Sequence, residues 1–167
     1  ILDKTGTITL GEPKVTHIEL ALGSDDDAVL QLAASLEAGS EHPLALSIIQ
    51  SARERGLALA AVENFQAVAG HGVQGVVSGH SLLFGNERLM RDSSIEIDSY
   101  IEKAQAMAAD AQTPMYFAVD GKLAAIIAVS DPIKDDSIAA IKRLQDAGIR
   151  VVMLTGDNRA TAKAVAD

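Results

Sequence analysis

The sequence predicts an α/β domain that is interrupted by an α+β insert. Two segments, Ile1 to Asp3 and residues 149–155, each place a polar residue directly after an apolar strand. Open parallel sheets bind their ligands at such carboxyl ends of strands. The residues between them alternate short strands, turns and helices, which is typical of an antiparallel sheet with flanking helices. We therefore expect residues 1–9 and 129–167 to form the α/β domain and residues 10–128 to form the insert.

The composition is that of a globular protein. Of the 167 residues, 48% are hydrophobic and 22% are charged, and the net charge of −9 argues against a nucleic-acid-binding face. The chain contains no cysteine, which excludes disulfides and thiolate metal sites. Its apolar runs are far shorter than the ~20 residues that a membrane helix needs. Because the chain opens within a predicted strand and stops within a predicted helix, we expect it to be a soluble fragment of a longer protein.

Two helices are expected early in the insert. The first begins at the capping residue Ser24 and carries the acids Asp25 to Asp27 in its first turn, where the helix dipole favours negative charge. The second begins at Pro43, a residue suited to a first helical turn, and ends at Gly56. The apolar face of the first helix consists of Val29, Leu32, Ala33 and Leu36.

Short apolar segments separated by turn residues predict the strands of the insert. Asp120-Gly121 is a strong hairpin signal because both residues tolerate positive φ, and Gly79-His80 is expected to join two further strands. The apolar spacing of residues 100–108 predicts another helix. The strands are expected over residues 15–20, 62–68, 73–77, 81–84, 115–119 and 123–129.

The character of the chain changes after the insert. Asp131-Pro132 predicts a break, and the apolar spacing of residues 138–144 predicts a helix that ends at Gly148. Residues 149–154 are almost entirely apolar, as expected of a parallel strand that is buried on both faces. Ile1-Leu2 is interpreted in the same way, as the end of a buried strand.

The opening pentapeptide, Asp3-Lys4-Thr5-Gly6-Thr7, carries the sharpest chemical signal. A carboxylate at the end of a strand can attack a phosphoryl group and form an aspartyl-phosphate. Lys4 can offset phosphate charge, and Gly6 lets backbone amides approach an anion closely. The alternative is a solvated pair of Asp3 and Lys4 in an ordinary loop.

A second phosphate-binding signal is the run Leu154-Thr155-Gly156-Asp157-Asn158. Thr155 and the amides after it lie where the start of a helix can hold a phosphate group. The alternative is an ordinary turn from strand to helix, with Asp157 acting only as a cap.

Two further segments are candidates for contact with a nucleotide. His42 precedes a helix and has an imidazole able to stack on a purine, although a histidine in this place is more often a cap or a surface residue. The segment from Gly70 to Gly75 fits the pattern G-x-G-x-x-G, but a strand rather than a helix is expected after it, which excludes a Rossmann site. The alternative role of these glycines is a tight turn between strands.

Together, these motifs resemble those of the P-type ATPases. The opening pentapeptide matches the phosphorylation motif of that family, and residues 154–158 match the second phosphate-binding motif of the dehalogenase-like phosphotransferases. The run Ser40-Glu41-His42-Pro43-Leu44-Ala45 resembles the nucleotide-binding signature of the heavy-metal (P1B-type) pumps, with Glu37 at the place of a further acidic residue. The resemblance covers essentially the whole chain and is closest to copper-transporting members. It implies a dehalogenase-like (Rossmannoid) phosphorylation domain interrupted by a nucleotide-binding domain.

The resemblance also implies a role for each matched residue. Asp3 is the phosphorylated nucleophile, and Asp3 and the carbonyl of Thr5 also bind Mg²⁺. The catalytic residues are Asp3, Lys4, Thr5, Thr155, Gly156 and Asp157. The nucleotide-binding residues are Glu37, His42, Gly70, Gly72, Val73, Gly85 and Asn86.

In this family ATP binds the insert, its γ-phosphoryl group passes to the aspartate, and hydrolysis drives a metal ion through the membrane. The resemblance therefore implies ATP and Mg²⁺ as cofactors. It implies as partners the rest of the phosphorylation domain, an actuator domain, transmembrane domains and a copper chaperone, on the cytoplasmic side of a bacterial plasma membrane. The sequence contains no transmembrane segment, Cys-Pro-Cys metal site, actuator domain or Gly-Asp-Gly-x-Asn-Asp motif. The isolated chain is thus expected to bind ATP without turning it over.

Three other functions stay open. A zinc or cadmium pump of the same family would share these motifs, because the residues that select the metal belong to the membrane region. A soluble dehalogenase-like phosphatase would use Asp3, but it normally has a second aspartate two residues later, where this chain has Thr5. A nucleotide-binding module without catalysis would need only the insert.

Overall fold

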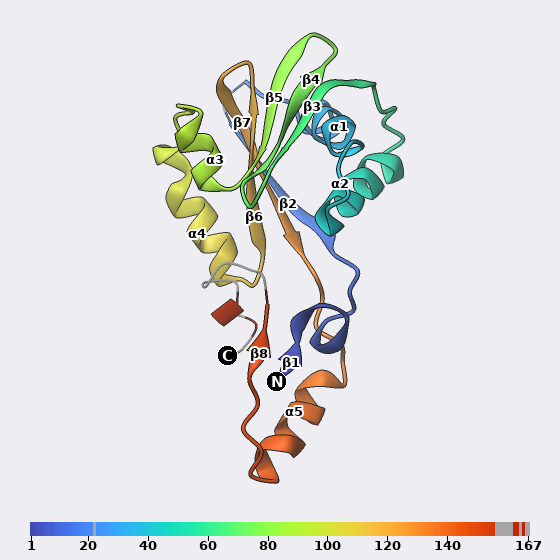
Figure 1. The fold of residues 1–167 in the computed structure, drawn as a ribbon, viewed down its shortest axis with the longest axis vertical. Helices are drawn as coiled ribbons and strands as arrows, with labels where there is room; N and C mark the ends of the chain where they lie inside the picture. The colour runs from blue at the N-terminus through green and yellow to red at the C-terminus, as the bar shows by residue number, and fades with distance from the viewer. Residues whose placement is uncertain (22, 156–161, 164, 166–167) are drawn as a thin grey trace.

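A computed structural model describes all residues except 22, 156–161, 164, 166 and 167. Its largest unit is a six-stranded antiparallel sheet with the strand order β2-β7-β6-β5-β4-β3 (Figure 1). The first and the last strand of this sheet in sequence order, β2 and β7, are neighbours in it. The strands are β2 (Lys14–Leu20), β3 (Val62–Val68), β4 (Gly72–Val77), β5 (His80–Gly85), β6 (Thr113–Val119) and β7 (Lys122–Ser130).

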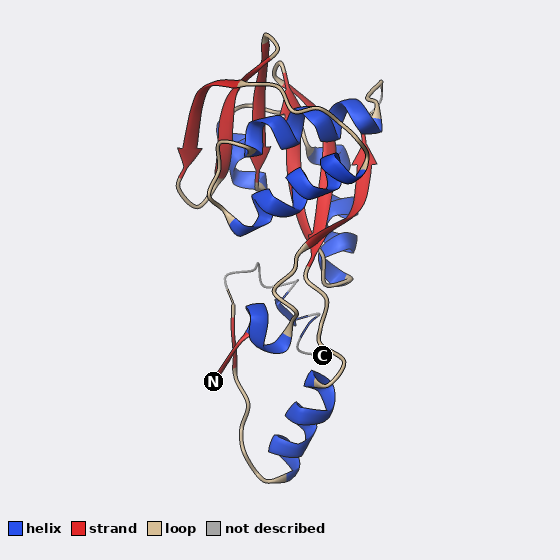
Figure 2. Cartoon of the chain, turned by 90° about the vertical axis from the view of Figure 1, so that its right-hand side faces the viewer, coloured by secondary structure: helices blue, strands red, loops and turns tan. Residues whose placement is uncertain are grey.

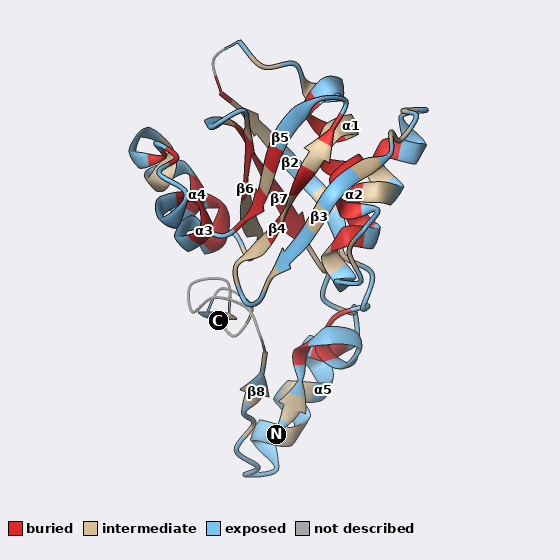
Figure 3. Ribbon diagram, turned by 45° about the horizontal axis from the view of Figure 1, so that its top comes forward, coloured by how far each residue is buried: buried red, intermediate tan, exposed pale blue. Residues whose placement is uncertain are grey.

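Helices cover both faces of this sheet. On one face lie α1 (Asp26–Glu37) and α2 (Pro43–Glu54), and on the other lie α3 (Glu87–Asp92) and α4 (Ile101–Ala109), as Figures 1 and 3 show. A short 3₁₀ turn, η2 (Asp98–Tyr100), leads into α4. None of the helices in the described part of the chain has the length and hydropathy needed to cross a membrane.

The sheet carries a separate apolar core on each face. Phe117 and Ile127 belong to the cluster under α1 and α2, whereas their neighbours Tyr116 and Ile126 belong to the cluster under α3 and α4. The two sets alternate because successive side chains of a strand point to opposite faces of the sheet. On the first face, the rings of Phe84 and Phe117 meet edge to face with their centres 5.9 Å apart. Burial on both faces explains why β7 is almost continuously apolar.

The first helix of the insert is confirmed, but its cap is not the predicted one. The Asp25 carboxylate, rather than Ser24, accepts a hydrogen bond of 3.0 Å from an amide in the first turn of α1. The next two acids, Asp26 and Asp27, form ion pairs of 2.7 and 3.1 Å with Arg55 after the end of α2. The acidic first turn therefore also ties the two helices together.

The hairpin turns follow from backbone conformation. Asp120 and Gly121 have positive φ values of 49° and 78°, which confirms the predicted hairpin between β6 and β7. The turn between β4 and β5 consists of Ser78 and Gly79, whose φ values are 51° and 81°. The prediction that His80 belongs to this turn is wrong, because it is already the first residue of β5.

One helix of the structure, α3, was not expected from the sequence. It has only six residues, too few to show the repeating apolar spacing of a helix. Its cap is Asn86, whose side-chain oxygen accepts a hydrogen bond of 3.0 Å from the amide of Leu89.

A smaller unit lies beyond one end of the six-stranded sheet (Figure 2). It comprises β1 (Leu2–Asp3), the tight turn η1 (Lys4–Ile8), α5 (Ser137–Asp146) and β8 (Met153–Leu154). Strands β1 and β8 pair in parallel. Two crossing segments, one on each side of the insert, connect the units and lie side by side, because Thr9 forms a β-bridge with Ile133.

The prediction that residues 149–154 form a strand buried on both faces is wrong for the described structure. Only the last two of them belong to β8, and Leu154 is 63% exposed. Ile1 is 88% exposed, which likewise contradicts its expected burial. Burial on both faces requires helices over both faces, and α5 buries only Ser137.

Candidate functional site

The pairing of β1 with β8 brings together the starts of the two segments that were predicted to bind phosphate. Asp3 is the last residue of β1 and is paired with Leu154, the last residue of β8. Thr155 directly follows Leu154, so Asp3 and Thr155 both lie at the carboxyl ends of two neighbouring parallel strands. Asp3 is exposed there. This is the place at which a parallel sheet presents side chains to a ligand.

The turn η1 shapes the loop after Asp3. Thr5 has an extended conformation, and Gly6 has a φ of 77°, a value that glycine adopts without strain. The carbonyl of Lys4 accepts a hydrogen bond of 3.0 Å from the amide of Thr9, which closes the turn. Lys4 is only 8% exposed, whereas Asp3 and Thr5 face solvent.

Asp3 and Thr5 provide oxygen atoms of the kind that Mg²⁺ binds. A carboxylate and a carbonyl are hard donors, and Mg²⁺ takes about six oxygens, several of them from water and substrate phosphate. These residues therefore fit as two ligands of a magnesium site. Among the residues that the structure describes, no three His, Asp or Glu side chains gather into a metal cluster. Gly156 and Asp157, also predicted for the phosphate site, lie outside the described residues.

Glu37, at the end of α1, is a buried carboxylate with an unused acceptor. It is 4% exposed, and within the described chain its Oε2 has no hydrogen-bond partner. Burial raises its pKa to about 6, and a hydrogen bond with the Ser40 side chain opposes the rise. An unpaired oxygen in such a place is costly unless a donor reaches it. The amino group of an adenine is a donor of the required kind.

The buried carboxylate gives a stability prediction. Because the pKa of Glu37 rises from its ordinary 4.5 to about 6 in the fold, ionisation opposes folding. The free energy of unfolding should therefore fall as pH rises from about 4.5 to above 6, by about 2 kcal/mol. We expect Glu37→Gln to be about 1–2 kcal/mol more stable than wild type at pH 7.5 in urea denaturation, and nearly equal at pH 4. The exposed neighbour Glu41→Gln is the control, and a destabilised Glu37→Gln at pH 7.5 would contradict the assignment.

His42 is the N-terminal cap of α2. Its Nδ1 accepts a hydrogen bond of 3.2 Å from the amide of Leu44, and its own amide donates to the Ser40 hydroxyl at 3.2 Å. His42 therefore has the capping role that the sequence offers as the alternative to nucleotide binding. Because Nδ1 accepts, a neutral His42 carries its proton on Nε2. The exposed ring therefore keeps a donor and an aromatic face for a ligand.

Two glycines place the connection between α1 and α2 against the sheet. A Cβ on Gly75 of β4 would lie 3.0 Å from the Leu36 side chain, and a Cβ on Gly39 would lie 2.8 Å from the ring of Phe65. Glu37, which follows Leu36, is therefore held beside β4. Gly72 lies three residues earlier on the same strand, about 10 Å away along it.

The three glycines predicted to bind nucleotide, Gly70, Gly72 and Gly85, lie close together and differ in their surroundings. Gly72 is paired with Gly85 of β5, and a Cβ on Gly72 would lie 2.2 Å from the carbonyl oxygen of Phe84. A Cβ on Gly85 would lie 2.2 Å from the carbonyl of His71. These two residues are glycines because the backbones approach closely. Gly70, with a φ of 71° and open space where a Cβ would be, is the one of the three that leaves room for a ligand.

Asn86 holds the turn between β3 and β4 in place. Its side-chain amide donates to the carbonyl of Gly70 at 2.9 Å, and its backbone amide donates to the carbonyl of His71 at 2.8 Å. Its oxygen caps α3. Val73 directs its side chain into the core under α1 and α2, so a contact with nucleotide would involve its backbone. The predicted nucleotide-binding residues thus lie in two places. One group surrounds the turn between β3 and β4, and the other, Glu37 and His42, lies at the connection between α1 and α2.

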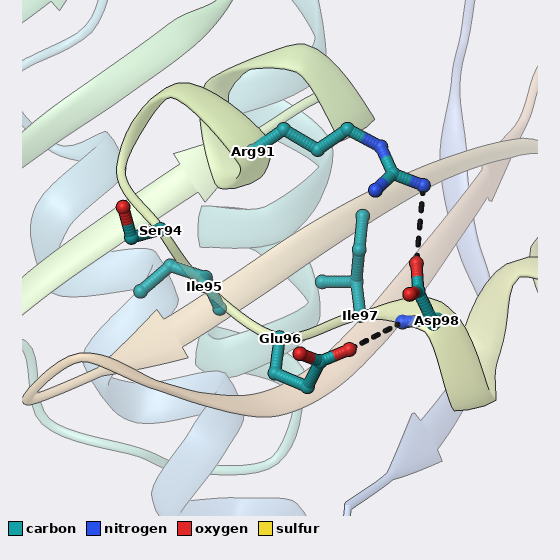
Figure 4. Close-up of a pocket in the computed structure, with 6 residues that line it drawn as sticks. All are labelled: Arg91, Ser94, Ile95, Glu96, Ile97 and Asp98. Atoms are coloured by element: carbon teal, nitrogen blue, oxygen red, sulfur yellow. Dashed lines mark hydrogen bonds and ion pairs between the residues drawn. The ribbon is translucent and has the colours of Figure 1, made fainter.

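A cavity of about 340 Å³ lies between the end of α3 and η2 (Figure 4), at the opposite end of α3 from Asn86. None of the predicted nucleotide-binding residues lines this cavity. It contains an ion pair of 3.2 Å between Arg91 and Asp98. Its lining residues are Arg91, Ser94, Ile95, Glu96, Ile97 and Asp98.

Comparison with known proteins gives matches over nearly the whole chain. The family described as haloacid dehalogenase-like hydrolase matches residues 1–167. Copper-transporting ATPase 1 of Rhizobium meliloti (strain 1021) is 48% identical over 165 residues, which are 99% of this chain and 20% of that protein. The chain thus spans about a fifth of the length of the curated relatives it matches.

Solved structures of P-type ATPases share the fold. A zinc-transporting PIB-type ATPase in the E2.Pi state superimposes with a TM-score of 0.76 at 34% identity, over 98% of this chain and 26% of that chain. The N-domain of HMA6, a copper-transporting P-type ATPase, superimposes with a TM-score of 0.59 at 26% identity, over 71% of this chain and 99% of that chain. Since the family match extends from the first residue to the last, the chain belongs to the haloacid dehalogenase-like hydrolases.

Proposed function

We propose that this chain is the ATP-binding and phosphorylation region of a copper-transporting P-type ATPase. The observation that carries the proposal is the parallel pairing of β1 with β8, which sets Asp3 opposite Leu154, the residue before Thr155. In this assignment residues 10–128 are the nucleotide-binding domain, and residues 1–9 and 129–167 belong to the phosphorylation domain. The longer protein would add actuator and transmembrane domains, place this region on the cytoplasmic side of the membrane, and receive copper from a chaperone.

The insert would bind the nucleotide and present its phosphates to the smaller unit. The unpaired Oε2 of Glu37 accepts from the adenine amino group, and the ring of His42 stacks on the base or donates from Nε2. The open space at Gly70 leaves room for the ribose or a phosphate beside the backbone. Asn86 contributes by fixing the turn that contains Gly70.

The phosphoryl transfer follows from the exposed carboxylate. An oxygen of Asp3 forms a bond to the γ-phosphorus as the bond from that phosphorus to the β,γ-bridging oxygen breaks, and ADP leaves. Lys4 and Thr155 stabilise the charge on the phosphoryl oxygens. Bound Mg²⁺ would supply further neutralisation of that charge, with Asp3 and the Thr5 carbonyl among its ligands. Water then hydrolyses the acyl phosphate and regenerates the carboxylate.

Nucleotide binding can be tested directly by NMR titration of the chain with ATP. A millimolar dissociation constant corresponds to only about 4 kcal/mol, which a few hydrogen bonds and one stacked ring supply. We expect shifts of the amides of residues 37–42, 70–73 and 85–86. Shifts confined to other residues, or none at several millimolar ATP, would refute the proposed site.

The contribution of the His42 ring to nucleotide binding can be measured separately from its contribution as a helix cap. Asparagine is a good N-cap, so His42→Asn keeps the hydrogen bond to α2 and removes the imidazole. We expect stability to be nearly unchanged and ATP to bind roughly tenfold more weakly, since an adenine contact is worth about 1–2 kcal/mol. Calorimetry would measure the affinity. The control is His80→Asn, at the far hairpin where the ring pairs with Asp120; equal affinities of the two variants would leave His42 with only its capping role.

The transported metal is proposed from sequence identity. The copper-transporting relative is 48% identical to this chain, whereas the zinc-transporting structure is 34% identical. A zinc pump, which the sequence motifs leave open, is the second candidate. ATPase activity of the longer protein in membranes should be stimulated by Cu⁺ and not by Zn²⁺, and the reverse preference would establish the second candidate.

A further inference from the structure

The segment that returns from the insert holds the loop that follows Asp3. The Lys134 ammonium donates a hydrogen bond of 2.7 Å to the carbonyl of Gly6, and the Lys134 amide donates to the carbonyl of Ile8 at 3.0 Å. The Ser137 hydroxyl, at the start of α5, donates to the same Ile8 carbonyl at 2.8 Å. Two carbonyls of the phosphorylation loop are therefore fixed by residues about 130 positions later in the chain.

Asp131 connects the two segments that cross between the units. It lies in the segment that returns from the insert (residues 131–134) and binds the segment that leads out to the insert (residues 9–12). Its Oδ1 accepts hydrogen bonds from the amides of Gly11 and Glu12 at 3.0 and 3.1 Å. Its Oδ2 accepts from the Thr9 hydroxyl at 2.6 Å. One carboxylate thus binds three donors of the segment that links the loop to the insert.

Thr9 extends this network into the loop itself. It is fully buried, and its Oγ1 lies 3.0 Å from the carbonyl of Lys4 and accepts from the amide of Gly6 at 3.4 Å. A hydroxyl has only one hydrogen to donate. The shorter contact to the charged carboxylate of Asp131 favours donation there. The orientation of the Thr9 oxygen, and with it the amide of Gly6, therefore depends on Asp131.

These hydrogen bonds influence the position of Asp3. Phosphoryl transfer depends mainly on how well the reacting groups are placed, and a displacement of about 1 Å can cost 10²-fold in rate. The loop after Asp3 is held by the return segment through Lys134 and Ser137, and by the outgoing segment through Thr9. Both segments lead into the insert, so the residues that connect the two units also hold the loop.

We propose that Asp131 and Lys134 are positioning residues for phosphoryl transfer to Asp3, which they accomplish by clamping the Lys4–Ile8 loop between the two segments that cross to the insert. The proposal rests on the function proposed above. The side-chain hydrogen bonds described for Asp131 and Lys134 all go to residues 6–12, none of which is among the proposed nucleotide-binding residues. Their loss should therefore affect the transfer step and leave the affinity for ATP unchanged.

The test compares variants of the longer membrane-bound protein. Rapid-quench measurements with γ-labelled ATP give the rate of phosphoenzyme formation, and nucleotide binding at equilibrium gives the affinity. We expect Asp131→Ala and Lys134→Met each to lower the rate about 10- to 100-fold with the ATP dissociation constant unchanged. Lys134→Arg keeps a donor for the Gly6 carbonyl and should restore the rate to within a few fold. Asp135→Ala, an exposed acid on the same segment, is the control.

A second measurement does not depend on nucleotide. In hydrogen exchange of the chain without ATP, the amides of Gly11 and Glu12 should exchange about five- to tenfold faster in Asp131→Ala than in Asp135→Ala. Normal phosphorylation rates in Asp131→Ala and Lys134→Met would overturn the proposal while leaving the proposed function intact. A wild-type protein that forms no phosphoenzyme would instead refute the proposed function, and this proposal with it.

Discussion

Gly72→Ala is expected to lower the free energy of unfolding by about 3–4 kcal/mol. The added Cβ would lie 2.2 Å from the carbonyl oxygen of Phe84 and 2.6 Å from the Cα of Gly85, both of them backbone atoms that cannot turn away. Its φ of 148° adds strain for any residue with a side chain. Because a domain is stable by only about 5–15 kcal/mol, this single methyl group should remove much of that margin.

The matched control for Gly72→Ala is Gly79→Ala in the next turn of the sheet. Gly79 also has a positive φ, of 81°, but nothing lies within 4 Å of its ideal Cβ position. Its substitution should therefore cost only the conformational strain, about 1–2 kcal/mol. Urea denaturation of the two variants separates close approach from backbone conformation. Equal losses would contradict the account of the Gly72–Gly85 contact.

Asp3→Asn is expected to abolish phosphorylation of the longer protein. A carboxamide is a poor nucleophile and cannot form the acyl phosphate, so the rate of phosphoenzyme formation should fall by at least about 10⁴-fold. ATP affinity should stay the same or rise, because a negative charge facing the γ-phosphate has been removed. Acid-quenched labelling measures the first quantity and equilibrium binding the second. Asp135→Asn should behave as wild type, and residual labelling of Asp3→Asn at a comparable rate would exclude Asp3 as the nucleophile.

The features that were predictable from the sequence are those set by a few neighbouring residues. Asp120 and Gly121 tolerate positive φ, and Pro43 suits the first turn of a helix, so the hairpin and the start of α2 were expected correctly. The first cap was misplaced by one residue because Ser24 and Asp25 are both good caps. The six-residue helix α3 was missed because it is too short for a periodic signal.

Contacts and burial that depend on distant parts of the chain are harder to predict from the sequence. The contacts of Lys134 with Gly6 and of Asp131 with Thr9 join residues more than 120 positions apart, and no local pattern indicates them. The close approach of Gly72 to the neighbouring strand, where a Cβ would lie 2.2 Å from the carbonyl oxygen of Phe84, also depends on a partner that the local sequence does not reveal. Burial of Leu154 was inferred from its apolar neighbours, but burial is decided by the layers that cover a strand.

The central claim, that Asp3 receives the phosphoryl group of ATP, is tested most directly by locating the modified residue. The longer protein would be incubated with ATP and Mg²⁺ and quenched in acid, and borohydride would reduce the acyl phosphate so that the modified aspartate becomes homoserine. Mass spectrometry of the peptides should then show homoserine at position 3 in the wild type and no such product in Asp3→Asn. Homoserine at another aspartate, or a wild-type peptide that contains only unmodified Asp3, would contradict the account.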